Sequence, residues 1–154
     1  MFQKKILFIT LLLLSSCGYE AIHSEKNFLS YNFSISELNF VGDRKVNLKI
    51  KEKLNRYILD KKDKDFTLKI SSTSEKTILA KNTAGDTTSF KNTISINVEI
   101  LMNNKYNNDF IIVESFNYNN ISNKFDLKKY EGEIKNNLAE LATRRLIFKL
   151  SNIQ

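Results

Sequence analysis

The alternation of apolar and polar residues between Phe90 and Met102 is the strongest constraint on what this chain can fold into. The apolar phase holds Phe90, Ile94, Ile96, Val98, Ile100 and Met102, and the polar phase holds Thr93, Ser95, Asn97 and Glu99. Because successive side chains of a strand point to opposite faces, the segment predicts a strand with one buried and one solvated face. A sheet built from such strands needs a covering layer on its buried face.

Three other segments predict further strands. Alternation from Phe33 to Val41 slips by one residue at Ser36-Glu37, which is typical of a strand with a bulge. The even apolar phase of residues 66–80 predicts a second strand, and residues 110–118 predict a fourth. We therefore expect four strands.

Polar turns separate the last three of these strands. Residues Lys81 to Thr88 predict a hairpin tip, in which Gly85 supplies a position that tolerates positive φ. The Asn-rich residues Asn103 to Asp109 predict a second turn. Both turns favour antiparallel pairing of neighbouring strands.

Two segments predict helices. Asp43 is a suitable N-cap for a helix of about fifteen residues, whose apolar residues recur every four positions at Val46, Ile50, Leu54 and Ile58. A long C-terminal helix, capped by Asn123 or Asp126, carries a predicted apolar stripe. That stripe consists of Leu127, Tyr130, Ile134, Leu138, Leu141 and Ala142.

The order of these elements is β-α-β-β-β-α, with no internal repeat. It predicts an α+β two-layer sandwich, in which two helices pack on one face of a four-stranded mixed sheet. We expect residues 33–154 to form a single domain of this kind.

The inventory of reactive residues argues against an enzyme. The 154 residues include one Cys, one His and four Gly, whereas a disulfide needs two cysteines and a structural zinc site needs several Cys or His ligands. His23 lies near the N-terminus without a recognisable Ser-His-Asp arrangement, and the isolated glycines form no phosphate loop. We expect a non-enzymatic protein without a metal or cofactor.

The first seventeen residues have the pattern of a lipoprotein signal. Lys4 and Lys5 precede the apolar run from Ile6 to Leu14, which is far shorter than the ~20 residues of a membrane span. The sequence Leu14-Ser15-Ser16-Cys17 resembles the bacterial lipobox, in which the cysteine is acylated, with palmitate for example, and the preceding segment is removed. The alternatives are an ordinary secretory signal with a coincidental cysteine, or a buried free thiol.

Lipidation at Cys17 would define three segments of the chain. Residues 1–16 become the signal peptide, residues 17–32 a lipidated leader and residues 33–154 the domain. Loss of Lys4 and Lys5 lowers the net charge of +7 by two, to +5. Gly18 follows the cysteine where lipoproteins of the inner membrane often carry Asp, so the resemblance implies the outer membrane, on its periplasmic side.

The positive charge has a different meaning in the cell envelope than in the cytoplasm. An exported lipoprotein meets little nucleic acid, so the expected polyanion is lipopolysaccharide, whose phosphates pair with Lys and Arg. Candidate contacts are Lys76, Lys81 and Lys91, around the first predicted hairpin. The alternative is that these lysines simply occupy solvated faces of an Asn- and Lys-rich chain.

The chain resembles the LptE-type lipoproteins that take part in lipopolysaccharide assembly. The resemblance rests on Cys17-Gly18-Tyr19, the element order, the Thr-rich hairpin from Asp86 to Leu101, and the strand-to-helix junction from Ser115 to Leu150. It implies a protein that helps the outer-membrane barrel LptD assemble, plugs its lumen and takes part in lipopolysaccharide delivery. Lys91 best matches the basic residue that follows the Thr-rich turn in this family.

A different role remains open at this stage. Small α+β lipoproteins also serve other envelope machines, as transporter accessories or activators of cell-wall synthesis, and a fold does not fix a function. A lipid-modified enzyme is a third class, for which the sequence offers no motif.

Overall fold

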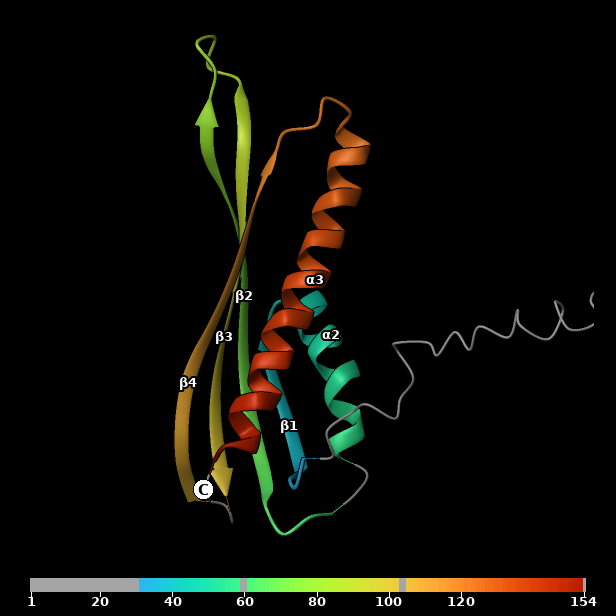
Figure 1. Cartoon of the computed structure of the whole chain (residues 1–154), viewed down its shortest axis with the longest axis vertical. Helices are drawn as coiled ribbons and strands as arrows, with labels where there is room; N and C mark the ends of the chain where they lie inside the picture. The colour runs from blue at the N-terminus through green and yellow to red at the C-terminus, as the bar shows by residue number, and fades with distance from the viewer. Residues whose placement is uncertain (1–30, 59–60, 103–104, 154) are drawn as a thin grey trace, which may run out of the picture. The chain divides into compact units, whose positions relative to one another are not determined.

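The computed structural model describes residues 31–58, 61–102 and 105–153 (Figure 1). The predicted signal peptide, Cys17 and all but the last two residues of the predicted leader lie outside these ranges. The described elements follow the predicted order β-α-β-β-β-α. They are β1 (Ser34–Gly42), α2 (Arg44–Leu54), the short 3-10 helix η2 (Asn55–Tyr57), β2 (Asp65–Lys81), β3 (Thr87–Met102), β4 (Lys105–Asn119) and α3 (Lys124–Ser151).

The four strands form one mixed sheet in the order β1-β2-β3-β4. β1 runs parallel to β2, and the other neighbouring pairs are antiparallel. The register between β1 and β2 shifts between Ile35 and Glu37, which confirms the predicted bulge. β2 and β3 are the longest strands, and the end of their hairpin projects beyond the helices in Figure 1.

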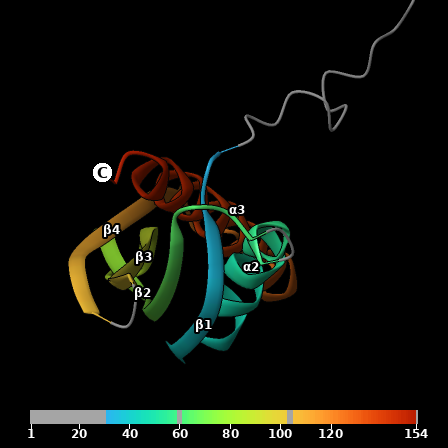
Figure 2. The same ribbon diagram turned by 90° about the horizontal axis from the view of Figure 1, so that it is seen from below.

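Both helices cover the same face of the curved sheet, as Figure 2 shows. The core between the two layers holds the predicted apolar residues of β2 and β3, including Leu68, Ile70, Ile96 and Val98, all at most 1% exposed. The two-layer α+β fold predicted from the sequence is therefore confirmed.

The turn from β1 into α2 is built by Gly42 and Asp43. Gly42 has a φ of 97°, in the left-handed region that favours glycine. Asp43 caps the helix as predicted, accepting hydrogen bonds from the backbone N–H groups of Lys45 and Val46 at 3.0 and 3.1 Å. The regular helix is shorter than predicted, with 11 residues, because its last turn tightens into η2.

Two details of the sequence prediction are wrong. The predicted turn from Asn103 to Asp109 is strand from Lys105 onward, because the Asn-rich segment pairs with the end of β3, Lys105 with Met102 and Asp109 with Glu99. Cross-strand hydrogen bonding here outweighs the low strand propensity of asparagine.

The second error concerns the apolar stripe of α3. Ile134, Leu138 and Ala142 are buried as predicted, whereas Tyr130 and Leu141 are 36% and 45% exposed. The helix begins at the predicted cap Asn123, whose side chain accepts a hydrogen bond from the N–H of Phe125 at 2.9 Å.

Candidate functional site

The face of the sheet that points away from the helices carries mainly hydroxyl and amide side chains. We call this surface the outer sheet face. Its residues are Ser71, Thr73, Glu75 and Thr77 of β2, Lys91, Thr93, Ser95, Asn97 and Glu99 of β3, and Ile111, Val113, Ser115 and Asn117 of β4. Cross-strand neighbours on this surface pair polar groups with polar groups along β2 and β3, for example Ser71 with Asn97 and Thr73 with Ser95.

Asn97 is the one polar side chain of this face with an unsatisfied buried atom. Its Oδ1 is buried and accepts no hydrogen bond from any residue that the structure describes. Its neighbours across the sheet are Ser71 and the exposed Ile111. A buried acceptor without a donor is costly to the fold.

The hairpin that joins β2 and β3 carries the lysines predicted to contact lipopolysaccharide. Its tip closes through a hydrogen bond from Asn82 N to Asp86 O at 2.9 Å, and Gly85 has the expected positive φ of 90°. Lys81, at the end of β2, is exposed. Lys91 lies half-buried on the outer sheet face.

The structure places Lys76 on the opposite side from Lys91. Lys76 pairs with Asn92, and Thr77 pairs with Lys91, so alternation directs Lys76 to the face that the helices cover. The three predicted lysines therefore do not form one cluster.

Lys76 belongs to a polar cluster that ties the hairpin to α3. Its Nζ lies 2.5 Å from Glu131 Oε1 and 3.8 Å from the centroid of the Phe90 ring. Tyr118 donates a second hydrogen bond to the same Glu131 oxygen at 2.9 Å. Burial, and then this hydrogen bond, raise the pKa of Tyr118 well above its ordinary value, so the phenol stays protonated as a donor.

A second ion pair joins the start of α2 to α3. Lys135 Nζ lies 2.7 Å from Asp43 Oδ2, while Oδ1 of Asp43 caps the helix. Burial alone raises the pKa of Asp43. The hydrogen bonds from Lys135 and from the capping N–H groups lower it by a larger amount, so the pKa lies below its ordinary value of 3.8.

This ion pair predicts a pH-dependent contribution to stability. A folded-state pKa below the unfolded value gives stability that is present above about pH 4 and is lost as the pH falls through the folded pKa. Asp43→Asn keeps a good N-cap but removes the charge. We expect the variant to lose about 1 kcal/mol of unfolding free energy at pH 7 and to approach the parent protein near pH 3. Urea unfolding at both values measures this, and an equal loss at both would contradict the assignment.

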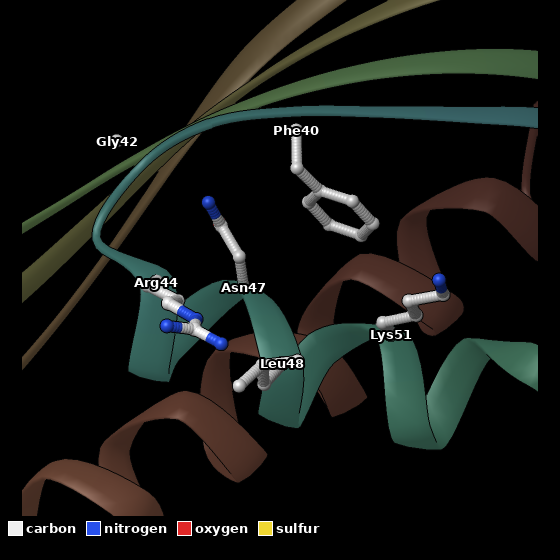
Figure 3. A pocket seen from close by; sticks show the side chains of 6 residues that line it. All are labelled: Phe40, Gly42, Arg44, Asn47, Leu48 and Lys51. Carbon is white, nitrogen blue, oxygen red and sulfur yellow. The ribbon is translucent and has the colours of Figure 1, made fainter.

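A small hollow lies between the end of β1 and α2. It has a volume of about 250 Å³ and is lined by Phe40, Gly42, Arg44, Asn47, Leu48 and Lys51. In Figure 3, Phe40 points from the strand toward the helix, and Asn47 rises from the helix toward the strand. Asn47 Nδ2 donates to Val41 O at 3.1 Å, so this residue fastens helix to strand.

The described part of the chain holds neither a metal-binding cluster nor a membrane-spanning helix. No group of three or more His, Cys, Asp or Glu side chains among the described residues is placed to hold a metal ion. Within the same ranges, no helix combines the length and apolar character that a membrane span requires.

Comparison with known proteins finds likeness at the level of structure. No protein-family model and no curated protein matches the sequence. The rare lipoprotein B of Shewanella oneidensis superposes with a TM-score of 0.55 at 12% identity, covering 75% of this chain and 97% of that one.

Two further lipoproteins show the same likeness. A minor lipoprotein of Acinetobacter baumannii gives a TM-score of 0.57 at 11% identity, covering 80% of this chain and 93% of its own. Lipoprotein B of Nitrosomonas europaea gives 0.55 at 10% identity, covering 79% and 86%. The domain therefore has the fold of these bacterial lipoproteins.

Part of the outer sheet face could be predicted from the sequence. The polar phase of β3 predicted a solvated face, and the structure confirms that this face is left uncovered by the helices. The buried acceptor of Asn97 could not be predicted, because it depends on how its neighbours on β2 and β4 close around it.

Proposed function

We propose that this protein is an outer-membrane lipoprotein that helps an LptD-type barrel assemble, plugs its lumen and takes part in the delivery of lipopolysaccharide to the cell surface. In this role the protein is not an enzyme and needs no cofactor. The acylated Cys17 holds it to the periplasmic side of the outer membrane, and the barrel and lipopolysaccharide are its partners.

The main support is the coincidence of two independent observations. The lipobox at Cys17 marks the chain for acylation, and the domain shares its fold with lipoproteins from three other bacteria. Neither observation depends on the other, since the lipobox is a pattern in the sequence and the likeness is one of fold. Several acyl chains anchor a protein firmly without a spanning helix.

The outer sheet face supports the choice of a barrel as partner. The lumen of an outer-membrane barrel is polar, so a plug must present hydroxyl and amide groups rather than an apolar surface. The alternating Thr93, Ser95 and Asn97 of β3 provide such groups at the centre of the sheet.

Anchoring and delivery are tested separately. Cys17→Ala should abolish incorporation of labelled palmitate and release the protein from the outer membrane, and continued labelling would exclude the lipobox. Depletion of the intact protein should lower the amount of lipopolysaccharide at the cell surface. An unchanged amount would contradict the role in delivery.

The hairpin lysines give a quantitative prediction for lipopolysaccharide binding. Charge reversal at Lys81 and Lys91 should raise the Kd for lipopolysaccharide about tenfold or more, because each lysine near an anionic surface contributes about 1 kcal/mol. Charge reversal at Lys61 and Lys62 is the matched control with the same change in net charge. Equal effects of the two double variants in the same binding titration would mean that binding depends on net charge alone.

A further inference from the structure

A cleft of about 330 Å³ lies between the two helices and the covered face of the hairpin strands. Three lysines line it from three different elements: Lys45 of α2, Lys76 of β2 and Lys135 of α3. Ser74 of β2 and Asn92 of β3 line it from the sheet. The hollow of Figure 3 is a separate feature, since the two share no lining residue.

Asn92 is the most informative residue of the cleft. It is only 5% exposed, and its side chain forms no hydrogen bond with any part of the chain in the described ranges. The following residues of the same phase on β3, Ile94 and Ile96, are apolar and fully buried. The amide atoms of Asn92 are not among the fully buried polar atoms of the described residues, so they reach the cleft, where they can hydrogen-bond to a ligand.

Gly132 gives a second, independent indication. It lies inside α3 and lines the cleft, although glycine in a helix interior is less favourable than alanine. A Cβ atom built on Gly132 would meet no other atom within 4 Å, so close packing does not explain the missing side chain. The absence of a side chain does keep the cleft open.

The charges of the cleft favour an anion. The ammonium of Lys76 is held by Glu131, and that of Lys135 by Asp43. Each lysine has three N–H donors, so both retain donors beyond these ion pairs. The ammonium of Lys45 forms no ion pair with another described residue. Because only Lys76 and Lys135 are balanced by a carboxylate, the cleft has an excess of positive charge.

We propose that this cleft binds a phosphate group. The amide of Asn92 and the ammonium of Lys45 donate hydrogen bonds to it, and Lys76 and Lys135 add positive charge from two other sides. Donors that converge from several elements suit the three terminal oxygens of a phosphate better than the two coplanar oxygens of a carboxylate. The inference goes beyond the proposed function and does not require a barrel partner, because the cleft lies within one domain.

The test uses the full mature lipoprotein in detergent micelles. It is titrated with inorganic phosphate and, separately, with mixed micelles of detergent and phosphatidylcholine that contain or lack phosphatidic acid. Saturable binding of inorganic phosphate, with a shift of the Asn92 side-chain amide in NMR spectra, identifies free phosphate as a ligand. Binding that requires phosphatidic acid identifies a lipid headgroup. Absence of saturable binding in both arms would overturn the proposal.

Variants connect any binding to the cleft. Asn92→Leu and Gly132→Leu should each weaken binding at least tenfold. Gly132→Ala should raise the Tm while leaving more of the binding intact than Gly132→Leu. Lys45→Gln should weaken binding more than the matched control Lys61→Gln. Unchanged binding by both leucine variants would contradict the site, whatever the result of barrel capture.

Discussion

Replacing Gly42 with alanine is expected to prevent stable folding, or to cost more than about 4 kcal/mol of unfolding free energy. The added Cβ would lie 1.9 Å from the carbonyl oxygen of Ser72, and the φ of 97° is one that alanine rarely adopts. The chain cannot move away easily, because the next residue, Asp43, donates its N–H to the same Ser72 oxygen at 3.0 Å. Urea unfolding monitored by circular dichroism measures the loss.

Gly85 provides the matched control. Its φ of 90° is similar, but a Cβ there would meet no atom within 4 Å. Gly85→Ala should therefore cost only the backbone strain of a left-handed residue, about 1–2 kcal/mol. A similar loss in the two variants would mean that close contact with Ser72 does not shape the turn between β1 and α2.

Truncation of Phe33 to alanine is expected to cost about 3–5 kcal/mol, the usual range for a buried phenylalanine. The side chain is 2% exposed. Its ring centroid lies 4.7 Å from that of Tyr57 and 5.9 Å from that of Phe66. Phe33 thereby fastens the start of the edge strand β1 to η2 and β2, so its loss removes both apolar burial and ring contacts.

Phe125→Ala is the control for this second prediction. Phe125 lies in the first turn of α3 and is 75% exposed, so its truncation should change the unfolding free energy by less than about 0.5 kcal/mol. If Phe33→Ala were as mild as Phe125→Ala in the same urea titration, the ring cluster would not anchor β1.

Local patterns in the sequence predicted most of the fold. The alternation in β3 predicted its buried face, the residue type of Asp43 predicted the N-cap, and a slip in the alternation predicted the bulge beside Ser36. These features depend only on residues that are neighbours in the sequence. The contact of Gly42 with Ser72 depends on the parallel pairing of β1 and β2, which no local pattern encodes.

The stripe of α3 shows why the prediction failed in one place. Buried residues recur every four positions, from Ile134 and Leu138 to Ala142, Leu146 and Leu150. Four residues exceed one helical turn, so the stripe drifts by about 40° at each step. Leu141 lies three residues after Leu138, which is less than one full turn. It is therefore rotated in the opposite direction and lies outside the buried stripe. Whether the buried stripe follows steps of four or of three residues depends on the surface that the helix covers, which the sequence of the helix does not contain.

The candidate site also combines features that the sequence predicts with contacts that it does not. Lys76, Lys81 and Lys91 all lie in the predicted hairpin, yet strand alternation separates Lys76 from Lys91. The ion pairs of Lys76 with Glu131 and Lys135 with Asp43 bridge 55 and 92 residues of sequence. Interactions over such separations exist only once the helices have packed on the sheet.

Co-purification decides whether this lipoprotein has a barrel as its partner. The mature protein, acylated and tagged at its C-terminus, is captured from detergent-solubilised outer membranes, with Cys17→Ala as the unanchored control. We expect a large outer-membrane barrel of the LptD type to be recovered in stoichiometric amount with the acylated protein. Efficient capture of the protein without a barrel, or with the subunits of a different envelope machine, would contradict a role in barrel assembly.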